Sequence, residues 1–271
     1  MPELPEVETT RAGIAACVVG REVTGVVVRT MRLRLPVPMT LTTELPGQVV
    51  ETVERRAKYL LLRAGAGTVI LHLGMSGSLR LLTESVPPGP HDHLDITFRD
   101  GSVLRLNDPR RFGLALWVYG DPLDHPLLRK LGPEPLEKEF DGDYLYQRSR
   151  GRVVAIKTFL MDQRIVVGVG NIYAAESLFL AGIHPILPAG TVSQPRYVRL
   201  VSAVREILAA AIAQGGTTLR DFHDVAGRPG YFQRALCVYG RAGAPCPRCG
   251  RAILSERQGQ RSTFYCAHCQ R

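Results

Sequence analysis

The spacing of hydrophobic and polar residues divides the chain into a β-rich first half and a helical second half. Apolar residues behind an acidic opening predict a helix over residues 5–18, which Gly20 ends. Eight short runs with branched or alternating side chains follow, and turn residues such as Asp100 and Gly101 separate them. Short strands at this spacing are typical of an antiparallel sandwich or barrel. We expect them at residues 23–28, 48–53, 59–62, 68–73, 78–82, 94–98, 102–106 and 113–118.

A segment with glycine and two prolines, which disfavours both helix and strand, separates the two halves. Residues 132–135 read Gly-Pro-Glu-Pro and an acidic run follows them, so we expect a linker over residues 132–152. Helical spacing then predicts helices over 153–161, 171–181 and 196–214, and glycines follow the last two. Residues 217–231 have weak periodicity and several glycines, which predicts a loop.

These boundaries predict an α+β protein with three structured parts. The first is an antiparallel β-sandwich domain with an N-terminal helix, over residues 1–131, and the linker 132–152 follows it. A helical domain is expected over 153–236, and a small arginine-rich part over 237–271. Four of the six cysteines lie in the last 26 residues.

The net charge and the hydropathy of the chain indicate what kind of molecule the protein binds. The 271 residues carry a formal net charge of +9, and such an excess favours a polyanion such as nucleic acid. The alternative is a surface that is simply basic. No apolar run approaches the ~20 residues that span a bilayer, and the acidic opening lacks the basic start of a signal peptide. We therefore expect a cytoplasmic protein without a membrane contact.

The cysteine spacing predicts a metal site. Cys246 and Cys249 form one pair, and Cys266 and Cys269 form a second pair after sixteen residues. Four thiolates at this spacing are typical of one closed, structural zinc site, and the alternative is an iron or redox site. Because protein fills all four ligand positions, no position is left for a metal-bound water. The residues between the pairs predict two short strands around a polar turn.

The first residues carry a possible nucleophile. Once Met1 is removed, Pro2 presents a secondary amine that can attack a sugar carbon and form an iminium, while Glu3 moves protons beside it. An α-amine has a pKa near ~7.7–8, whereas a lysine at ~10.4 needs strong desolvation to compete. We therefore favour Pro2 and expect Met1 to be absent from the active protein. The structural alternative is that proline and glutamate only stabilise a helix start.

Several motifs occur together in one order, at residues 1–8, 56–61, 72–77, 108–113, 168–174 and 229–232 and in the four-cysteine tail. Taken as a set, they resemble those of the bacterial formamidopyrimidine-DNA glycosylase family, and the resemblance covers nearly the whole chain. No single motif is sufficient, but the ordered set is specific.

The resemblance implies a repair enzyme that acts on double-stranded DNA containing oxidised purines, such as 8-oxoguanine and formamidopyrimidines. Such enzymes flip the damaged nucleotide out of the duplex. Pro2 would then displace the base and form a Schiff base that undergoes β- and δ-elimination. Glu3 would be the acid/base at the sugar, Lys58 would assist base removal and β-elimination, and Arg261 would serve δ-elimination. A monomer is expected, with DNA between the first two domains and gripped by the zinc finger.

The resemblance also implies a set of DNA contacts. Met75, Arg110 and Phe112 would fill the gap left by the flipped base, although Met75 or Phe112 alone more often packs in a core. Asn171 is expected to cap a helix and to seat a phosphate there. The loop 217–231 would close over the flipped base. Further DNA contacts are expected from His72, His91 and Arg152.

Two other functions stay open. One is an endonuclease VIII-like glycosylase for oxidised pyrimidines, against which Leu4 and the complete Arg110 and Phe112 pair argue. The other is a non-catalytic zinc-ribbon DNA-binding protein, against which the intact Pro2, Glu3 and Lys58 argue. Cys17 and Cys237 are expected to be packing residues.

Overall fold

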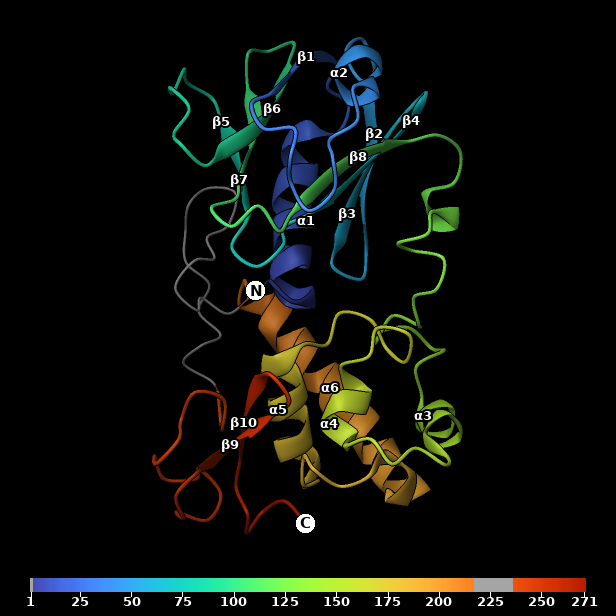
Figure 1. Cartoon of the computed structure of the whole chain (residues 1–271), viewed down its shortest axis with the longest axis vertical. Coiled ribbons are helices and arrows are strands. Elements are labelled where there is room, and N and C mark those ends of the chain that lie inside the picture. The colour runs from blue at the N-terminus through green and yellow to red at the C-terminus, as the bar shows by residue number, and fades with distance from the viewer. Residues whose placement is uncertain (1, 217–235) are drawn as a thin grey trace. The chain divides into compact units, whose positions relative to one another are not determined.

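The computed structural model describes residues 2–216 and 236–271 (Figure 1). The described chain forms two compact units. The first contains the residues up to Arg129 together with residues 214–216, and the second contains Lys130–Ala213 together with residues 236–271. The loop predicted at residues 217–231 lies outside the described residues.

The first unit begins with helix α1, Leu4–Val18. Glu3 and Glu6 form a capping box at its start, in which the backbone N–H of Glu3 donates to Glu6 Oε2 at 2.8 Å. Pro5 stands in the first turn, where the missing N–H costs no helical hydrogen bond. The helix therefore begins where the sequence places an acid, a proline and a second acid within four residues.

Two four-stranded antiparallel sheets make up the rest of this unit. Their strand orders are β1-β6-β7-β5 and β2-β3-β4-β8, and all eight predicted strands are present with ends shifted by a few residues. The expected α+β class with an antiparallel sandwich is confirmed. The short helices α2 (Thr40–Glu44) and η1 (Pro122–Asp124) were not predicted. The strands are β1 Val23–Val28, β2 Val50–Arg56, β3 Tyr59–Ala64, β4 Gly67–His72, β5 Ser78–Leu82, β6 Asp92–Phe98, β7 Val103–Asn107 and β8 Leu114–Val118.

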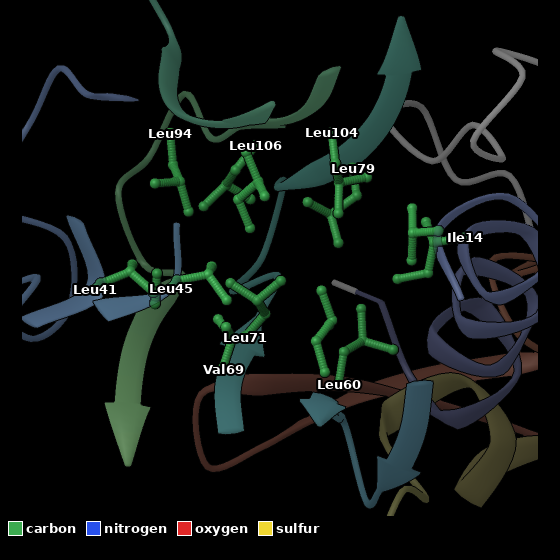
Figure 2. Close-up of a cluster of buried hydrophobic side chains, with 14 of the residues drawn as sticks. Ile14, Leu41, Leu45, Leu60, Val69, Leu71, Leu79, Leu94, Leu104 and Leu106 are labelled. Carbon is green, nitrogen blue, oxygen red and sulfur yellow. The ribbon is translucent and has the colours of Figure 1, made fainter. Parts of the chain in front are cut away.

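The core of this unit lies between the two sheets. Alternation along each strand turns every second side chain inward, so Leu104 and Leu106 of β7 are buried with Leu60 of β3 and Leu71 of β4. Figure 2 shows these side chains directed toward one another, with Ile14 of α1 closing one end of the cluster. Cys17 packs against the same core, as expected.

The second unit is helical and carries a hairpin. Helices α3 (Gly142–Ser149), α5 (Asn171–Ala181) and α6 (Gln194–Ala213) pack together. A Cβ at Gly142 would lie 2.5 Å from Val198 Cγ2, so this glycine allows the close approach of α3 to α6. The remaining elements are α4 (Ile156–Leu160), η2 (Ala189–Thr191), β9 (Leu254–Gln258) and β10 (Arg261–Tyr265).

Two local predictions in this unit were wrong. Helix α3 lies inside the segment expected to be a linker, because Asp141 accepts a hydrogen bond from the Tyr144 N–H and caps the helix at 2.7 Å. Helix α4 begins at Ile156 and not at residue 153. The chain before it is extended, since the Val154 carbonyl accepts the Ala189 N–H and residue 155 forms a β-bridge with Pro188. In the described ranges, no helix has the length and apolar character that a membrane crossing requires.

Candidate active site and metal centre

Pro2 and Glu3 lie at the start of α1, and both are buried. The carboxylate of Glu6 holds the Glu3 backbone and is itself only 2 % exposed. Gly216 lies against it, because a Cβ there would be 3.1 Å from Glu6 Oε1, and its φ of +82° also favours glycine. Neither Glu6 nor Gly216 was predicted to be a site residue from the sequence. Only the fold brings residue 216 back to the first helical turn.

Lys58 lies in the tight turn between β2 and β3. Arg56 and Tyr59 are the last paired residues of the hairpin, so Ala57 and Lys58 alone form its loop. Lys58 is 4 % exposed. Tyr59 pairs with His72 at the end of β4, and their rings lie 4.9 Å apart. The hairpin thus brings together Lys58 and His72, which the sequence listed as separate candidates.

His72 is held as a neutral imidazole. The Gly74 N–H donates to His72 Nδ1 at 2.9 Å, which leaves Nε2 as the ring donor. Burial first, and then the positive charges of Arg34 and Lys58, lower the pKa of His72 from 6.5 to about 4. His72 can therefore donate one hydrogen bond to a phosphate oxygen at neutral pH without itself adding charge.

This lowered pKa predicts a stability difference at acid pH. Between pH 6.5 and 4 the unfolded chain binds a proton at residue 72 that the folded chain does not, so the folded state loses up to about 3 kcal/mol as the pH falls. The contribution is fully present above pH 6.5. We expect the His72→Gln variant to lack this loss, because glutamine does not titrate. Urea unfolding of both proteins between pH 4 and 7 measures the difference, and parallel curves would contradict it.

Met75, Arg110 and Phe112 lie together on one face of this unit. Arg110 Nη1 is 3.8 Å from Met75 Sδ, and Met75 and Phe112 are 39 % and 51 % exposed. Core packing therefore does not account for the two apolar side chains. Next to them is a hollow of about 330 Å³ whose lining includes His72 and Arg34. Arg34 was missed in the sequence, where it is one arginine among thirty.

Buried Asp108 shapes the loop that carries Arg110 and Phe112. Its Oδ2 accepts the Gly113 N–H at 2.7 Å, and its Oδ1 accepts the Arg110 N–H at 3.3 Å. The Asp108 N–H donates to the carbonyl of His91 at 2.9 Å. His91 itself is exposed, just before β6. The carboxylate of Asp108 thus fixes the backbone around Arg110 and Phe112, and its N–H fixes that of His91.

The second unit holds the remaining candidates. Arg152 and Arg261 line a cavity of about 650 Å³ together with Lys157 and Arg164. Arg261 is the first residue of β10 and is exposed. Lys157 is 2 % exposed, and its Nζ donates to Thr263 Oγ1 at 2.7 Å and to the Ser262 carbonyl at 3.1 Å. This lysine ties α4 to the hairpin and was missed, because a lone lysine in an apolar helix is not a signal by itself.

Asn171 is not a helix cap. Gly170 is the N-cap of α5 and Asn171 is the first helical residue. The Asn171 Nδ2 donates to the Ser262 carbonyl at 3.1 Å and to Tyr239 Oη at 3.4 Å, whereas Oδ1 is buried without a hydrogen-bond partner. The amide therefore links α5 to β10, and the glycine takes the cap because its backbone is extended there.

The four predicted cysteines come together in a closed site. Cys246 Sγ lies 3.9 Å from Cys269 Sγ, Cys249 Sγ lies 3.5 Å from Cys266 Sγ, and all four sulfurs lie within 4.8 Å of one another. Zn–S bonds of about 2.3 Å in a tetrahedron separate sulfurs by about 3.8 Å, so the donor set fits one zinc ion. The predicted zinc site is confirmed, and the site is structural because no ligand position is open.

Glu176 anchors the cysteine-bearing tail to α5. Its carboxylate accepts backbone N–H groups from Cys237, Val238 and Tyr239 at 2.7–2.9 Å. Burial raises the pKa of Glu176 against the effect of these hydrogen bonds. Cys237 packs beside the small core of the tail, as expected. No sequence signal identifies Glu176, since its three partners lie about sixty residues away.

Sequence models of one protein family match most of the chain. The model described as "Formamidopyrimidine-DNA glycosylase N-terminal domain" matches residues 1–115, and that described as "Formamidopyrimidine-DNA glycosylase H2TH domain" matches residues 131–223. A third, "Zinc finger found in FPG and IleRS", matches residues 243–271.

Individual proteins that are similar to this chain are formamidopyrimidine-DNA glycosylases as well. The chain is 62% identical over 277 residues to the formamidopyrimidine-DNA glycosylase of Alkalilimnicola ehrlichii and 60% identical over 271 residues to that of Syntrophotalea carbinolica, with both chains covered completely. Among solved structures, the MutM (FPG) protein of Thermus thermophilus is similar at a TM-score of 0.89 and 38% identity, over 99% of this chain and 98% of that chain. Lactococcus lactis Fpg in complex with DNA containing an abasic site has a TM-score of 0.91 at 35% identity, over 99% of both chains.

Proposed function

This chain belongs to the formamidopyrimidine-DNA glycosylase family, and on that premise we propose which of its residues carry out the chemistry. It is a DNA glycosylase and AP lyase of base excision repair, with one structural zinc site. We propose that it excises oxidised purines, 8-oxoguanine and formamidopyrimidines, from double-stranded DNA. The main support is the buried Pro2 and Glu3 pair at the start of α1, a helix joined by the Glu8–Arg55 ion pair to the hairpin that bears Lys58.

Pro2 is the proposed nucleophile. With Met1 removed, its nitrogen lone pair attacks C1′ of the flipped nucleotide, and the bond from C1′ to the base breaks with its electrons going to the base. Glu3 supplies and removes protons at the sugar as the ring opens to the Schiff base. Removing a proton from C2′ then expels the 3′ phosphate, and a second elimination expels the 5′ phosphate.

Two basic residues support these steps. Lys58 assists departure of the base and the first elimination; it is buried, and its positive charge acts on His72. Arg261 serves the second elimination from the hairpin turn, where its guanidinium can stabilise a departing phosphate. Zinc supplies no chemistry to these steps, because its four ligand positions are filled by thiolates.

Met75, Arg110 and Phe112 are proposed to replace the flipped base. Their exposure and close grouping allow an apolar side chain and a ring to stack in the gap, while the Arg110 guanidinium bonds the edge of the unpaired base. His72, His91, Arg152 and Asn171 are proposed phosphate contacts.

The working form is proposed to be a cytoplasmic monomer in which the sandwich domain (1–131), the helical domain (153–236) and the zinc finger (237–271) all contact DNA. The loop 217–231 is proposed to contact the flipped base. Sedimentation with and without a lesion duplex would measure the stoichiometry, and a two-to-one complex would contradict the monomer.

The test of this function is capture of the covalent intermediate. We expect borohydride present during turnover on a duplex with 8-oxoguanine opposite cytosine to join the DNA to the N-terminal peptide through Pro2. Peptide mapping of the product identifies the residue, and a cross-link to a lysine would overturn the assignment. A thymine glycol duplex in the same assay should react more slowly. Faster reaction there would favour the oxidised-pyrimidine activity instead, and no cleavage of either duplex would indicate a DNA-binding protein.

A further inference from the structure

The turn that carries Lys58 has an unfavourable backbone conformation. Ala57 has a φ of 56°, and among the described residues only Arg111 shares this feature without being glycine. A two-residue hairpin loop with positive φ at its first position only has the pattern of a type II′ turn, which favours glycine there because a Cβ is crowded. Ala57 is nevertheless completely buried. Something outside the turn must therefore hold it in this form.

Arg55 is placed to do so. Its Nη1 donates to the Ala57 carbonyl at 3.0 Å, and its Nε donates to Glu8 Oε2 on α1 at 2.8 Å. The other Glu8 oxygen accepts from Arg11 Nε at 2.7 Å, so the carboxylate is fixed from both sides. The Arg55 side chain is 12 % exposed, which limits screening by solvent. Because the guanidinium is a rigid fork, one side chain links the helix to the turn.

We propose that Glu8 and Arg55 are positioning residues for Lys58. They hold the Ala57 turn in its strained form and tie it to the same helix whose first turn carries Pro2 and Glu3. The Lys58 amine is thereby aimed at the sugar that Pro2 attacks. This inference rests on the role of Lys58 in the proposed function. In this role Glu8 and Arg55 act through the turn and not on the reacting atoms.

The competing explanation is that the ion pair only stabilises the sandwich. The same hairpin contains a matched control, because Arg63 of β3 pairs with Glu54 of β2 at 3.2 Å. Arg63→Met removes the same charge from the same sheet without touching the turn. A purely structural role predicts that both arginine variants lose stability and that neither changes the rate constant of the folded enzyme.

The experiment measures single-turnover excision of 8-oxoguanine by the full zinc-loaded protein, with enzyme in excess. We expect Arg55→Met to be slower by about 10- to 100-fold, which is the effect of displacing a catalytic group by about 1 Å. Arg63→Met should stay within about twofold of the wild type, because exposed ion pairs contribute little. Arg55→Lys should fall between them, since one ammonium cannot reproduce the fork.

Ala57→Gly provides the decisive variant. Glycine adopts positive φ without crowding, so the turn no longer needs Arg55 to keep its form. When Ala57→Gly is added to Arg55→Met, it should restore most of the single-turnover excision rate that Arg55→Met loses. The double-mutant cycle should show coupling between positions 55 and 57. Recovery of rate without recovery of the melting temperature would separate positioning from stability.

Three results would overturn the proposal. They are an Arg55→Met rate equal to that of Arg63→Met, a slow Arg55→Met enzyme that glycine at position 57 does not rescue, and rates that follow the melting temperature across all variants. If Arg55→Met does not fold, Arg55→Lys and Glu8→Gln carry the same comparison. Borohydride capture with the wild-type enzyme separates a failure of the proposed function from a failure of the positioning role. If no covalent product forms, the proposed function is refuted. If the product forms, only the positioning role is in question.

Discussion

Changing Glu3 to glutamine is expected to lower the rate of base excision by about 10²- to 10⁴-fold, the usual contribution of a general acid/base. The fold should survive, because the backbone N–H of residue 3 still donates to Glu6 Oε2 and the helix keeps its start. Glutamine has nearly the same shape as glutamate, but it does not exchange protons in the range of the reaction. Single-turnover excision on a duplex with 8-oxoguanine opposite cytosine measures the loss.

Glu51→Gln is the matched control for this variant. Glu51 is an exposed carboxylate on β2 of the same unit, so its removal changes the net charge equally. We expect it to retain wild-type excision. If Glu3→Gln keeps more than about a tenth of the wild-type excision rate, Glu3 is not the acid/base, because a loss of less than about tenfold is below the usual contribution of such a group. A lower melting temperature in Glu3→Gln alone would instead assign it a mainly structural role.

Removing the metal is expected to have the second large effect. Structural zinc sites contribute about 10–16 kcal/mol of binding free energy at neutral pH, which is larger than the core of a short tail supplies. Among the described residues, that core contains six buried ones, of which two are zinc ligands and two belong to α5 (Ala175, Phe179, Val238, Cys246, Ile253 and Cys266). Without the ion, the β9–β10 hairpin should lose its fixed form, and Lys157 should lose its partner at Thr263.

Removal of the zinc ion should also lower the affinity for DNA. Loss of two charge-assisted hydrogen bonds of about 1.5 kcal/mol each weakens binding by about 100-fold, and Arg261 is the first candidate to lose them. Cys246→Ser should reproduce the effect of a chelator, whereas Cys237→Ala should retain one zinc per chain because Cys237 is not among the four sulfurs. Metal content and DNA titration on the same samples make the comparison. Unchanged affinity in a zinc-free Cys246→Ser protein would contradict the role of the hairpin.

Local patterns along the chain determined much of this protein. The eight strands follow from short runs of branched or alternating side chains between turn residues, because these patterns act within a few neighbouring residues. The zinc ligands follow from spacing, because two residues between cysteines fit one tight turn around a metal. The start of α1 follows from Glu3, Pro5 and Glu6, which act within four residues. Such features depend on neighbours that the sequence itself places together.

Tertiary structure alone decided the contacts that orient these groups. Arg55 reaches Glu8 across 47 residues, Glu176 reaches Cys237 across 61, and Lys157 reaches Thr263 across 106. In each case a charged side chain is buried or half-buried, which is favourable only when a specific partner lies within reach. The order of the strands and helices in space determines that partner, and no spacing along the chain encodes it. The strain at Ala57 belongs to the same class, because a lone alanine carries no sign of positive φ until the hairpin closes around it.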